Sequence, residues 1–403
     1  MTAALEFRHV DILFPSAHTK RSRREQLRQA LELLDSGLPR MQIAERTGTV
    51  VGVADACLSV APGEISVLMG LSGSGKSTLL RAANGLNTVT RGKVLVGGAD
   101  SEVDVAACDA ARLRRVRRER VAMVFQQFGL LPWRTVRENV GLGLELRGVA
   151  LSERQRIVDE KLALVGLKDW ADRYASELSG GMQQRVGLAR AFATEADILL
   201  MDEPFSALDP LIRTKLQDEL LSLQRLVRKT ILFVSHDLDE ALKLGNRISI
   251  LESGRIVQTG APQDIVLRPA DDYVAEFVRH MNPLTVLTGG MVMRRHDVLA
   301  CEGEHLWLDT ARRYRVTRDT LGACRAVRVD GIDTSFVHYQ DVDGDTLASA
   351  GVVVIAPVSL SLHRLIQLRQ LSGHPVLLAE DGQIIGVCDE NEIVRALAGS
   401  RRA

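Results

Sequence analysis

The segment ISVLMGLSGSGKSTLLRAANGL, residues 65–86, decides the fold, because an apolar run leads through a glycine-rich turn into a helical stretch. The turn matches the pattern G-x-x-x-x-G-K-[ST] at every fixed position. Its glycines let the backbone curl so that successive N–H groups face phosphate oxygens, and the helix adds its dipole. We therefore expect a nucleotide phosphate site built from Gly70, Leu71, Ser72, Gly73, Ser74, Gly75, Lys76, Ser77 and Thr78.

Two side chains of this turn have distinct expected roles. Lys76 reaches the β- and γ-phosphates of ATP, and the hydroxyl of Ser77 is placed to bind Mg²⁺. The alternative is a flexible loop that fits the pattern by chance. The strand before the turn and the helix after it disfavour that alternative.

A second apolar run, Ile198–Met201, ends in two adjacent carboxylates, Asp202 and Glu203. A strand buried on both faces has no structural use for two acids at its tip. We therefore assign Asp202 to Mg²⁺, through the water shell of the ion, and Glu203 to the attacking water as general base. A solvated strand end is the alternative, and it accounts for one acid more easily than for two.

Apolar runs alternate with helical stretches along the first two thirds of the chain. This alternation predicts an α/β fold with a mostly parallel sheet that is covered on both faces. The other strand candidates share this apolar character and lie at Val50–Val60, Val121–Phe125, Ile231–Ser235 and Ile248–Glu252.

Two parts of the chain depart from this alternation. Residues 18–49 follow an opening strand at Leu5–Phe14 and break the strand pattern. Leucines recur in this segment at helical spacing and predict a helical insert: Leu27, Leu31 and Leu34. Composition also shifts after Arg268-Pro269. We expect two domains, 1–280 and 281–403, of which the second is small and α+β.

The composition disfavours several classes of protein. Among the 403 residues, 51 basic side chains balance 51 acidic ones, which disfavours a nucleic-acid partner. The five cysteines include no C-x-x-C pair and indicate reduced thiols, neither a disulfide framework nor a zinc site. No run approaches the roughly 18 apolar residues of a membrane-spanning helix, and the N-terminus lacks the pattern of a signal peptide. Any membrane role is expected to be peripheral.

One further motif names a family. The stretch Leu178-Ser179-Gly180-Gly181-Met182-Gln183-Gln184-Arg185 resembles the signature of ABC ATPases, and it lies just before the carboxylate strand. Other family motifs stand around it in the expected order. Gln126 resembles the Q-loop glutamine, Ser206-Ala207-Leu208-Asp209 the D-loop, and His236 the switch histidine. The resemblance covers Leu5 to about Phe277, and it implies a P-loop ABC-type ATPase fold with an inserted helical signature subdomain.

The resemblance also implies roles for these residues. Gln126 would contact Mg²⁺ and the attacking water, and His236 would bond the γ-phosphate. The signature, Ser179 with Gly180 and Gly181, would bind the γ-phosphate of ATP held by a second chain, which implies a homodimer. Phe14 is the candidate for the aromatic side chain that stacks on adenine.

Longer segments of the sequence resemble one particular branch of the ABC ATPases. The insert, the tail and the segments GLSGSGKSTLLRAANGL, SALDPLIRTKLQDEL and SHDLDEAL together resemble the ATPases of quaternary-amine importers. The segment FQQFGLLPWRTVRENVGLGLELRGV is most similar to the choline branch, with glycine betaine as the next expected solute. This family implies an integral-membrane permease, an extracytoplasmic solute-binding protein, and a peripheral location on the cytoplasmic face of a bacterial inner membrane.

The tail carries a weaker resemblance. Leu360–Leu397 is similar to one CBS motif, whereas the preceding half is degenerate. Asp389 and Glu392 stand where such motifs usually carry the threonine and aspartate that bind ribose and phosphate. Negative charge there argues against nucleotide binding. We therefore expect a structural or dimerising module first, and a sensor second.

Four alternatives remain open at this point. The chain belongs to an importer of another solute, or it is an ABC ATPase without a transporter, although it lacks the second ATPase half or long coiled coil typical of that class. The stretch LELLDSGLPRMQIAERTG resembles part of a helix-turn-helix but is too short for a full DNA-binding unit. The basic run Arg112–Arg120 is expected to be a solvated helix, with RNA or lipid headgroups as its alternative partners.

Overall fold

The computed structural model describes residues 3–16, 22–97, 102–206, 208–279, 284, 287–341 and 351–397. The chain divides into two compact units. The first comprises Met1–Ile265 with Pro269–Phe277, and the second Val266–Arg268 with Val278–Ala403. The division at Phe277 lies close to the boundary expected near residue 280. Within the described residues, no helix combines the length and the apolar character needed to cross a bilayer.

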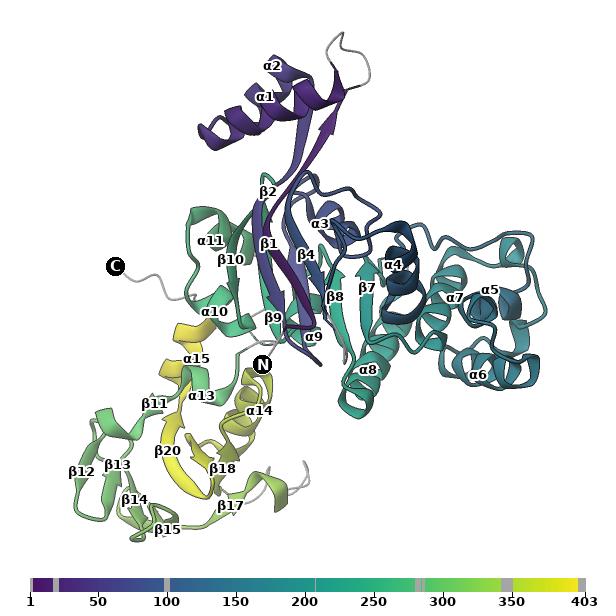
Figure 1. Ribbon diagram of the computed structural model, residues 1–403. Helices are drawn as coiled ribbons and strands as arrows, with labels where there is room; N and C mark the ends of the chain where they lie inside the picture. Colours follow the sequence, from purple (N-terminus) through teal and green to yellow (C-terminus); the bar gives the residue numbers. More distant parts are fainter. Residues whose placement is uncertain are drawn as a thin grey trace. The chain divides into compact units, whose positions relative to one another are not determined.

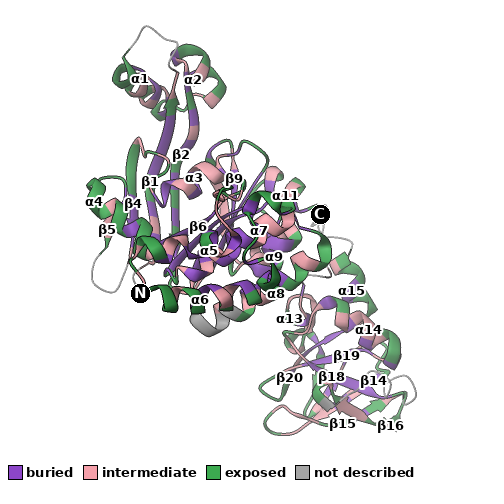
Figure 2. Ribbon diagram, turned by 90° about the vertical axis from the view of Figure 1, so that its right-hand side faces the viewer, coloured by how far each residue is buried: buried purple, intermediate pink, exposed green. Residues whose placement is uncertain are grey.

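A six-stranded sheet forms the centre of the first unit, in the order β10-β9-β3-β8-β7-β6 (Figure 1). Five of its strands run parallel, and only β10 is antiparallel, to its neighbour β9. Every residue of β3, β7 and β8 is buried, as expected for strands covered by helices on both faces (Figure 2). The strands are β3 (Ile65–Met69), β6 (Val121–Val124), β7 (Ile198–Asp202), β8 (Thr230–Val234), β9 (Arg247–Glu252) and β10 (Arg255–Gly260).

Helices connect and cover these strands. Helix α3 follows β3, and α9 follows β8. Between β6 and β7 the chain forms the predicted helical subdomain, in which α5 begins with a capping box between Thr135 and Glu138. The helices of this unit are α3 (Lys76–Ala82), α4 (Ala110–Arg115), α5 (Val136–Leu146), α6 (Leu151–Leu164), α7 (Gly180–Ala193), α8 (Pro210–Val227), α9 (Leu238–Leu244), α10 (Pro262–Leu267) and α11 (Asp272–Val278).

A second, antiparallel sheet of the first unit has the order β2-β1-β4-β5. It comprises β1 (Leu5–Pro15), β2 (Thr49–Val60), β4 (Arg91–Val96) and β5 (Val103–Asp104), and it shares one hydrophobic core with the parallel sheet. The insert is helical as predicted. Its helices α1 (Arg23–Asp35) and α2 (Arg40–Thr47) lie at the end of the β1–β2 ribbon (Figure 1). Ala30, Leu34 and Ile43 anchor them on apolar residues of that ribbon.

The second unit is α+β, as predicted, and contains two five-stranded sheets. Strand β18 separates two cores: Val354 and Ala356 pack toward the helices, whereas Val353 and Ile355 pack toward the other sheet. The mixed sheet comprises β11 (Arg294–Arg295), β20 (Gln383–Cys388), β19 (Val376–Glu380), β18 (Val353–Pro357) and β17 (Phe336–His338), with helices α13 (Gly289–Val292), α14 (Leu362–Ser372) and α15 (Glu390–Leu397).

An antiparallel meander occupies part of the stretch before Leu360, the half of the tail whose resemblance to a CBS motif is degenerate. Its strands are β12 (Ala300–Glu302), β13 (His305–Trp307), β14 (Tyr314–Arg318), β15 (Cys324–Val329) and β16 (Ile332–Thr334). Leu306, Val316 and Val327 form its buried face. The meander therefore covers one face of the mixed sheet, while α14 and α15 cover the other.

Candidate active site

The glycine-rich turn joins β3 to α3 and requires its glycines for steric reasons. The φ angles of Gly70, Gly73 and Gly75 are +140°, +74° and +102°, which is the region that side chains disfavour. A Cβ on Gly70 would lie 2.1 Å from the carbonyl oxygen of Leu251, and one on Gly75 would lie 2.4 Å from that of Gly52. The turn is thus packed against neighbouring backbone, so these two glycines have no substitute.

Lys76 begins helix α3, and its side chain lies inside this turn with 7% of its surface exposed. Its Nζ donates hydrogen bonds to the carbonyl oxygens of Gly70 (2.8 Å) and Leu71 (2.9 Å). Burial lowers the pKa of Lys76, and the nearby carboxylates of Glu203 and Asp202 oppose that shift. The two hydrogen bonds therefore hold the ammonium group inside the glycine-rich turn.

Asp202 ends β7 and is fully buried. Its Oδ1 accepts a hydrogen bond from the Ser77 hydroxyl at 2.7 Å, and its Oδ2 accepts from Arg81 Nη2 at 2.8 Å and Nε at 3.1 Å. A hydroxyl and a carboxylate are hard oxygen donors of the kind that Mg²⁺ prefers, so the residues present fit that ion. Arg81 was not predicted, although it stands four residues after Ser77, on the same face of α3.

The three residues predicted to act on the attacking water meet at one edge of the sheet. Gln126, Glu203 and His236 follow the parallel neighbours β6, β7 and β8, whose carboxyl ends share that edge. Glu203 Oε2 accepts a hydrogen bond from Gln126 Nε2 at 3.2 Å and lies 3.4 Å from His236 Nδ1. The structure thus brings all three together around one carboxylate oxygen.

The backbone of Glu203 is held in an unusual conformation, with φ at +49°. Its N–H donates to the Val234 carbonyl at 3.1 Å, and its own carbonyl accepts from Gln184 Nε2 at 3.2 Å. Such left-handed residues are costly and persist where the surroundings fix them. Gln184 belongs to the signature segment, so α7 helps to fix the backbone from which the Glu203 carboxylate projects.

A buried carboxyl, Glu240, lies behind the segment that carries His236. It accepts hydrogen bonds from the Ser235 hydroxyl and from Gln217 Nε2 (3.1 Å). Burial raises the pKa of Glu240, an effect that these two hydrogen bonds oppose. The Ser235 hydroxyl also accepts from the Asp237 N–H at 3.0 Å, so this network orders both neighbours of His236.

Phe14 lies near the end of β1, and 43% of its surface is exposed. A Cβ on Gly52 would lie 2.8 Å from Phe14 Cε2 and 3.2 Å from Thr78 Cγ2. The ring therefore lies across Gly52, beside the first turn of α3. The insert does not displace it, because β1 and β2 pair directly, with Phe14 opposite Val50.

Among the described residues, the signature residues Ser179, Gly180 and Gly181 have no contact with the phosphate turn comparable to that of Gln184 with Glu203. Ser179 caps α7, and its hydroxyl accepts from the Met182 N–H at 3.4 Å; Gly180 is the first, exposed residue of the helix, and Gly181 follows it. Within the part of the chain that the structure describes, no hydrogen bond or ion pair joins this trio to residues 70–78. In the D-loop, Ser206 Oγ donates to the Glu203 carbonyl at 3.1 Å, whereas Ala207 lies outside the described residues.

Two further contacts fix the turn from distant parts of the chain. Arg40, the first residue of α2 in the insert, donates from Nη1 to the Gly73 carbonyl at 2.9 Å. The Tyr273 hydroxyl on α11 accepts from the Leu71 N–H at 3.3 Å and donates to the Leu251 carbonyl at 3.3 Å. No local pattern in the sequence points to either residue, because each acts across a long separation along the chain.

Comparisons with known proteins agree with this geometry. A family model described as "ABC transporter" matches residues 53–206. The chain is 42% identical over 383 residues to the glycine betaine/proline betaine transport system ATP-binding protein ProV of Escherichia coli K12, covering 93% of this chain and 94% of that protein.

Two other relatives match a shorter part. The choline transport ATP-binding protein OpuBA of Bacillus subtilis 168 is 43% identical over 222 residues, which are 55% of this chain and 56% of that protein. Among solved structures, the dimeric structure of MJ0796, a bacterial ABC transporter cassette, is similar with a TM-score of 0.53 and 29% identity. That match covers 64% of this chain and 98% of the cassette.

Proposed function

The chain belongs to the ABC transporter family, as the ATP-hydrolysing subunit of a quaternary-amine importer, and from that premise we propose that its transported solute is glycine betaine or a related betaine. The extent of similarity carries this proposal. The match to the glycine betaine/proline betaine relative covers 94% of that protein, so it extends across the insert and the tail, whereas the match to the choline relative covers 56%. Glycine betaine therefore ranks above choline, in the reverse of the order expected from the sequence.

We assign proton transfer during hydrolysis to Glu203. Its carboxylate accepts a proton from the water that attacks the γ-phosphorus of ATP, and the bond to the ADP oxygen breaks to release inorganic phosphate. Gln126 and His236 lie within 3.4 Å of the same carboxylate oxygen and would orient that water and the γ-phosphate. Lys76 would bind the β- and γ-phosphates from inside the turn.

Ser77 and Asp202 would hold Mg²⁺, with Gln126 as a third ligand. The ion, when bound, neutralises charge on the phosphates. Arg81 keeps Asp202 oriented from the opposite side, through Oδ2, and leaves the Oδ1 side to Ser77.

Two copies of the chain would complete each site. Ser179 and Gly180, which are exposed, and the half-buried Gly181 would contact the γ-phosphate bound by the partner copy, because no hydrogen bond joins them to the described phosphate turn of their own chain. The related cassette whose structure is dimeric supports this arrangement. Phe14 would stack on adenine, since its exposed ring lies beside Thr78. Closure of the dimer over ATP would then supply the mechanical work.

An importer needs further protein partners in addition to the ATPase subunits. The ATPase pair would act on an integral-membrane permease from the cytoplasmic face of a bacterial inner membrane, with an extracytoplasmic solute-binding protein delivering the solute. No nucleic acid takes part. Residues 1–280 would form the ATPase domain, and residues 281–403 a CBS-like structural or dimerising domain.

Uptake of labelled glycine betaine and labelled choline tests the proposal in cells that lack this chain. Restoring the wild-type chain should restore betaine uptake, and unlabelled betaine should outcompete choline. The Glu203→Gln variant should restore neither. Choline uptake that betaine does not suppress would reassign the solute to choline. Uptake of neither solute would leave the ATPase in place and remove the quaternary-amine assignment.

A further inference from the structure

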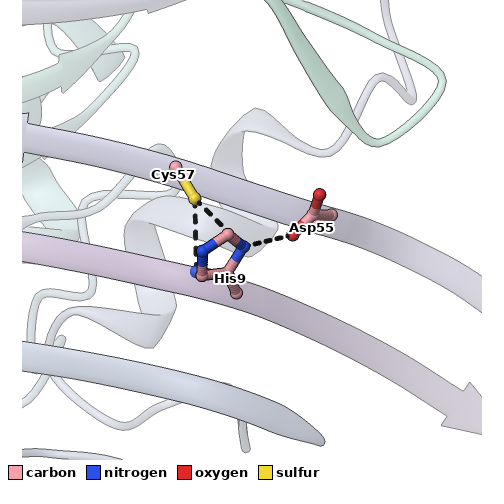
Figure 3. A group of neighbouring side chains, drawn as sticks. All are labelled: His9, Asp55 and Cys57. Carbon is pink, nitrogen blue, oxygen red and sulfur yellow. Dashed lines mark hydrogen bonds and ion pairs between the residues drawn. The ribbon is translucent and has the colours of Figure 1, made fainter.

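A cluster of three chemically different side chains lies on the exposed face of the β1–β2 ribbon (Figure 3). His9 on β1 faces Asp55 and Cys57 on β2, and all three are exposed. Neither the phosphate turn nor the carboxylate edge uses them. Their ligand atoms, one nitrogen, one oxygen and one sulfur, lie within 4.8 Å of one another.

Two bulges place these side chains on one face. Phe7 pairs with Leu58 and Val10 with Ala56, so Arg8 and His9 together oppose Cys57. The next pair, Ile12 with Val53, leaves Ala54 and Asp55 opposite Asp11. Between Phe7 and Ile12 each strand thus carries one extra residue, and bulges of this kind change the direction in which a side chain points.

The bulges are fixed by buried groups. The φ angles of His9 and Asp55 are +49° and +51°, a conformation that residues other than glycine disfavour. Asp11 is 1% exposed and accepts from the Asp55 N–H at 2.8 Å and from Arg91 Nε at 2.6 Å. A Cβ on Gly92 of β4 would lie 2.2 Å from the His9 carbonyl oxygen, so only glycine lets β4 pass the first bulge.

The Nδ1–Sγ distance in the cluster suits a tetrahedral cation, whereas the Nδ1–Oδ1 distance is that of a hydrogen bond, which a bound cation would replace. His9 Nδ1 lies 2.8 Å from Asp55 Oδ1 and 3.6 Å from Cys57 Sγ. A tetrahedral zinc ion with bonds of about 2.3 Å to sulfur and about 2.0 Å to nitrogen holds those two atoms about 3.5 Å apart. Calcium and magnesium prefer oxygen ligands alone, so a thiolate and an imidazole select a softer metal.

We propose that His9, Asp55 and Cys57 form a site for a transition-metal cation of the zinc type. The three protein ligands leave the fourth position to water. Arg8, the residue before His9, is paired with Glu6 at 2.6 Å. The absence of C-x-x-C spacing argued against zinc at the sequence level. That argument does not apply here, because the fold supplies the second and third ligands from another strand.

Cobalt titration of the full-length chain tests the site, after chelator treatment and in the absence of nucleotide. Co²⁺ bound by a thiolate gives a near-ultraviolet charge-transfer band, which the oxygen ligands Ser77 and Asp202 cannot produce. Wild type should develop this band with about one equivalent of Co²⁺ per chain, and Zn²⁺ should displace it.

Variants decide the identity of the ligands. Cys57→Ser should abolish the band, and His9→Ala should weaken Co²⁺ binding at least about tenfold. Cys301→Ser is the matched control, since Cys301 is also exposed but accepts a hydrogen bond from Arg318 and lies in the second unit. It should keep the band. A band that survives Cys57→Ser, or wild type that shows no saturable band, would overturn the proposal. Circular dichroism of each variant verifies folding.

Discussion

Acidic residues near strand ends serve opposite purposes in the two units. At the carboxyl edge of the first sheet, Glu203 keeps 20% of its side chain exposed and His236 keeps 62%. In the second unit, Asp389 and Glu392 are satisfied within the fold. Asp389 Oδ1 accepts from Arg369 Nε at 2.6 Å and Glu392 Oε2 from the Asp389 N–H at 3.1 Å.

Glu392 is also 6% exposed and lies 3.6 Å from Arg294 Nε. Glu203, Gln126 and His236 converge at the end of the parallel strands, whereas Asp389 and Glu392 have cationic partners in their own unit. The difference favours a nucleotide site in the first unit and a structural role for the acids of the second.

The strongest test of this comparison is Glu203→Gln. Loss of the base should reduce kcat for ATP hydrolysis by about 10²–10⁴-fold. ATP binding should persist, because glutamine keeps the shape of the side chain, and the variant should trap the closed dimer. Steady-state phosphate release and equilibrium ATP binding measure the two effects.

Glu160→Gln provides the matched control for this variant. Glu160 lies on α6 with 57% of its side chain exposed, and its substitution should leave kcat unchanged. Near-normal turnover in Glu203→Gln would remove Glu203 from the general-base role and would weaken the contrast between the two units.

A smaller effect is expected from Arg40→Ala, which tests whether the helical insert supports the phosphate turn. The substitution removes a hydrogen bond to the Gly73 carbonyl that is worth about 1 kcal/mol. The Kd for ATP should therefore rise about fivefold. Isothermal titration calorimetry measures that change.

Arg46→Ala is the control, because Arg46 is an exposed residue in the last turn of the same helix. Its Kd for ATP should match that of wild type. Equal Kd values for all three proteins would show that the insert does not support the phosphate turn.

Local sequence patterns indicated most residues of the candidate active site, because these residues lie in short segments of adjacent positions. Gly70 to Ser77 and Asp202-Glu203, for which we propose phosphate binding and catalysis, each form one short segment. Arg40 and Tyr273 escaped prediction, since each reaches the turn from a distant helix. His9 and Cys57 escaped for the same reason, as only a pair of bulges brings them together.

In the second unit, local patterns predicted elements but not their arrangement. The segment Leu360–Leu397, which resembles one CBS motif, forms α14, β19, β20 and α15. The meander was missed because its strands are only three to six residues long, too short for alternation to stand out. The sequence also displayed the charge of Asp389 and Glu392 without their partners Arg369 and Arg294, so it suggested repulsion of phosphate where the structure shows internal pairing.

The variant with the smallest expected effect tests whether Asp389 and Glu392 repel phosphate or only pair within the second unit. We combine Asp389→Asn and Glu392→Gln with Lys76→Ala, so that any remaining ATP binding reports on the tail. If the acids only repelled phosphate, their removal would create a nucleotide site. Because they pair with Arg369 and Arg294, we expect no gain in binding and a loss of about 1–2 kcal/mol in the stability of the second unit.

Calorimetric ATP titration and chemical denaturation measure the two outcomes. Glu390→Gln is the matched control, because Glu390 is an exposed acid on the same turn of α15 and should change neither quantity. Saturable ATP binding by the triple variant would show that charge alone closes the tail to nucleotides. Unchanged binding with lowered stability would show that the acids of the tail hold its fold together, while those of the first unit face a ligand.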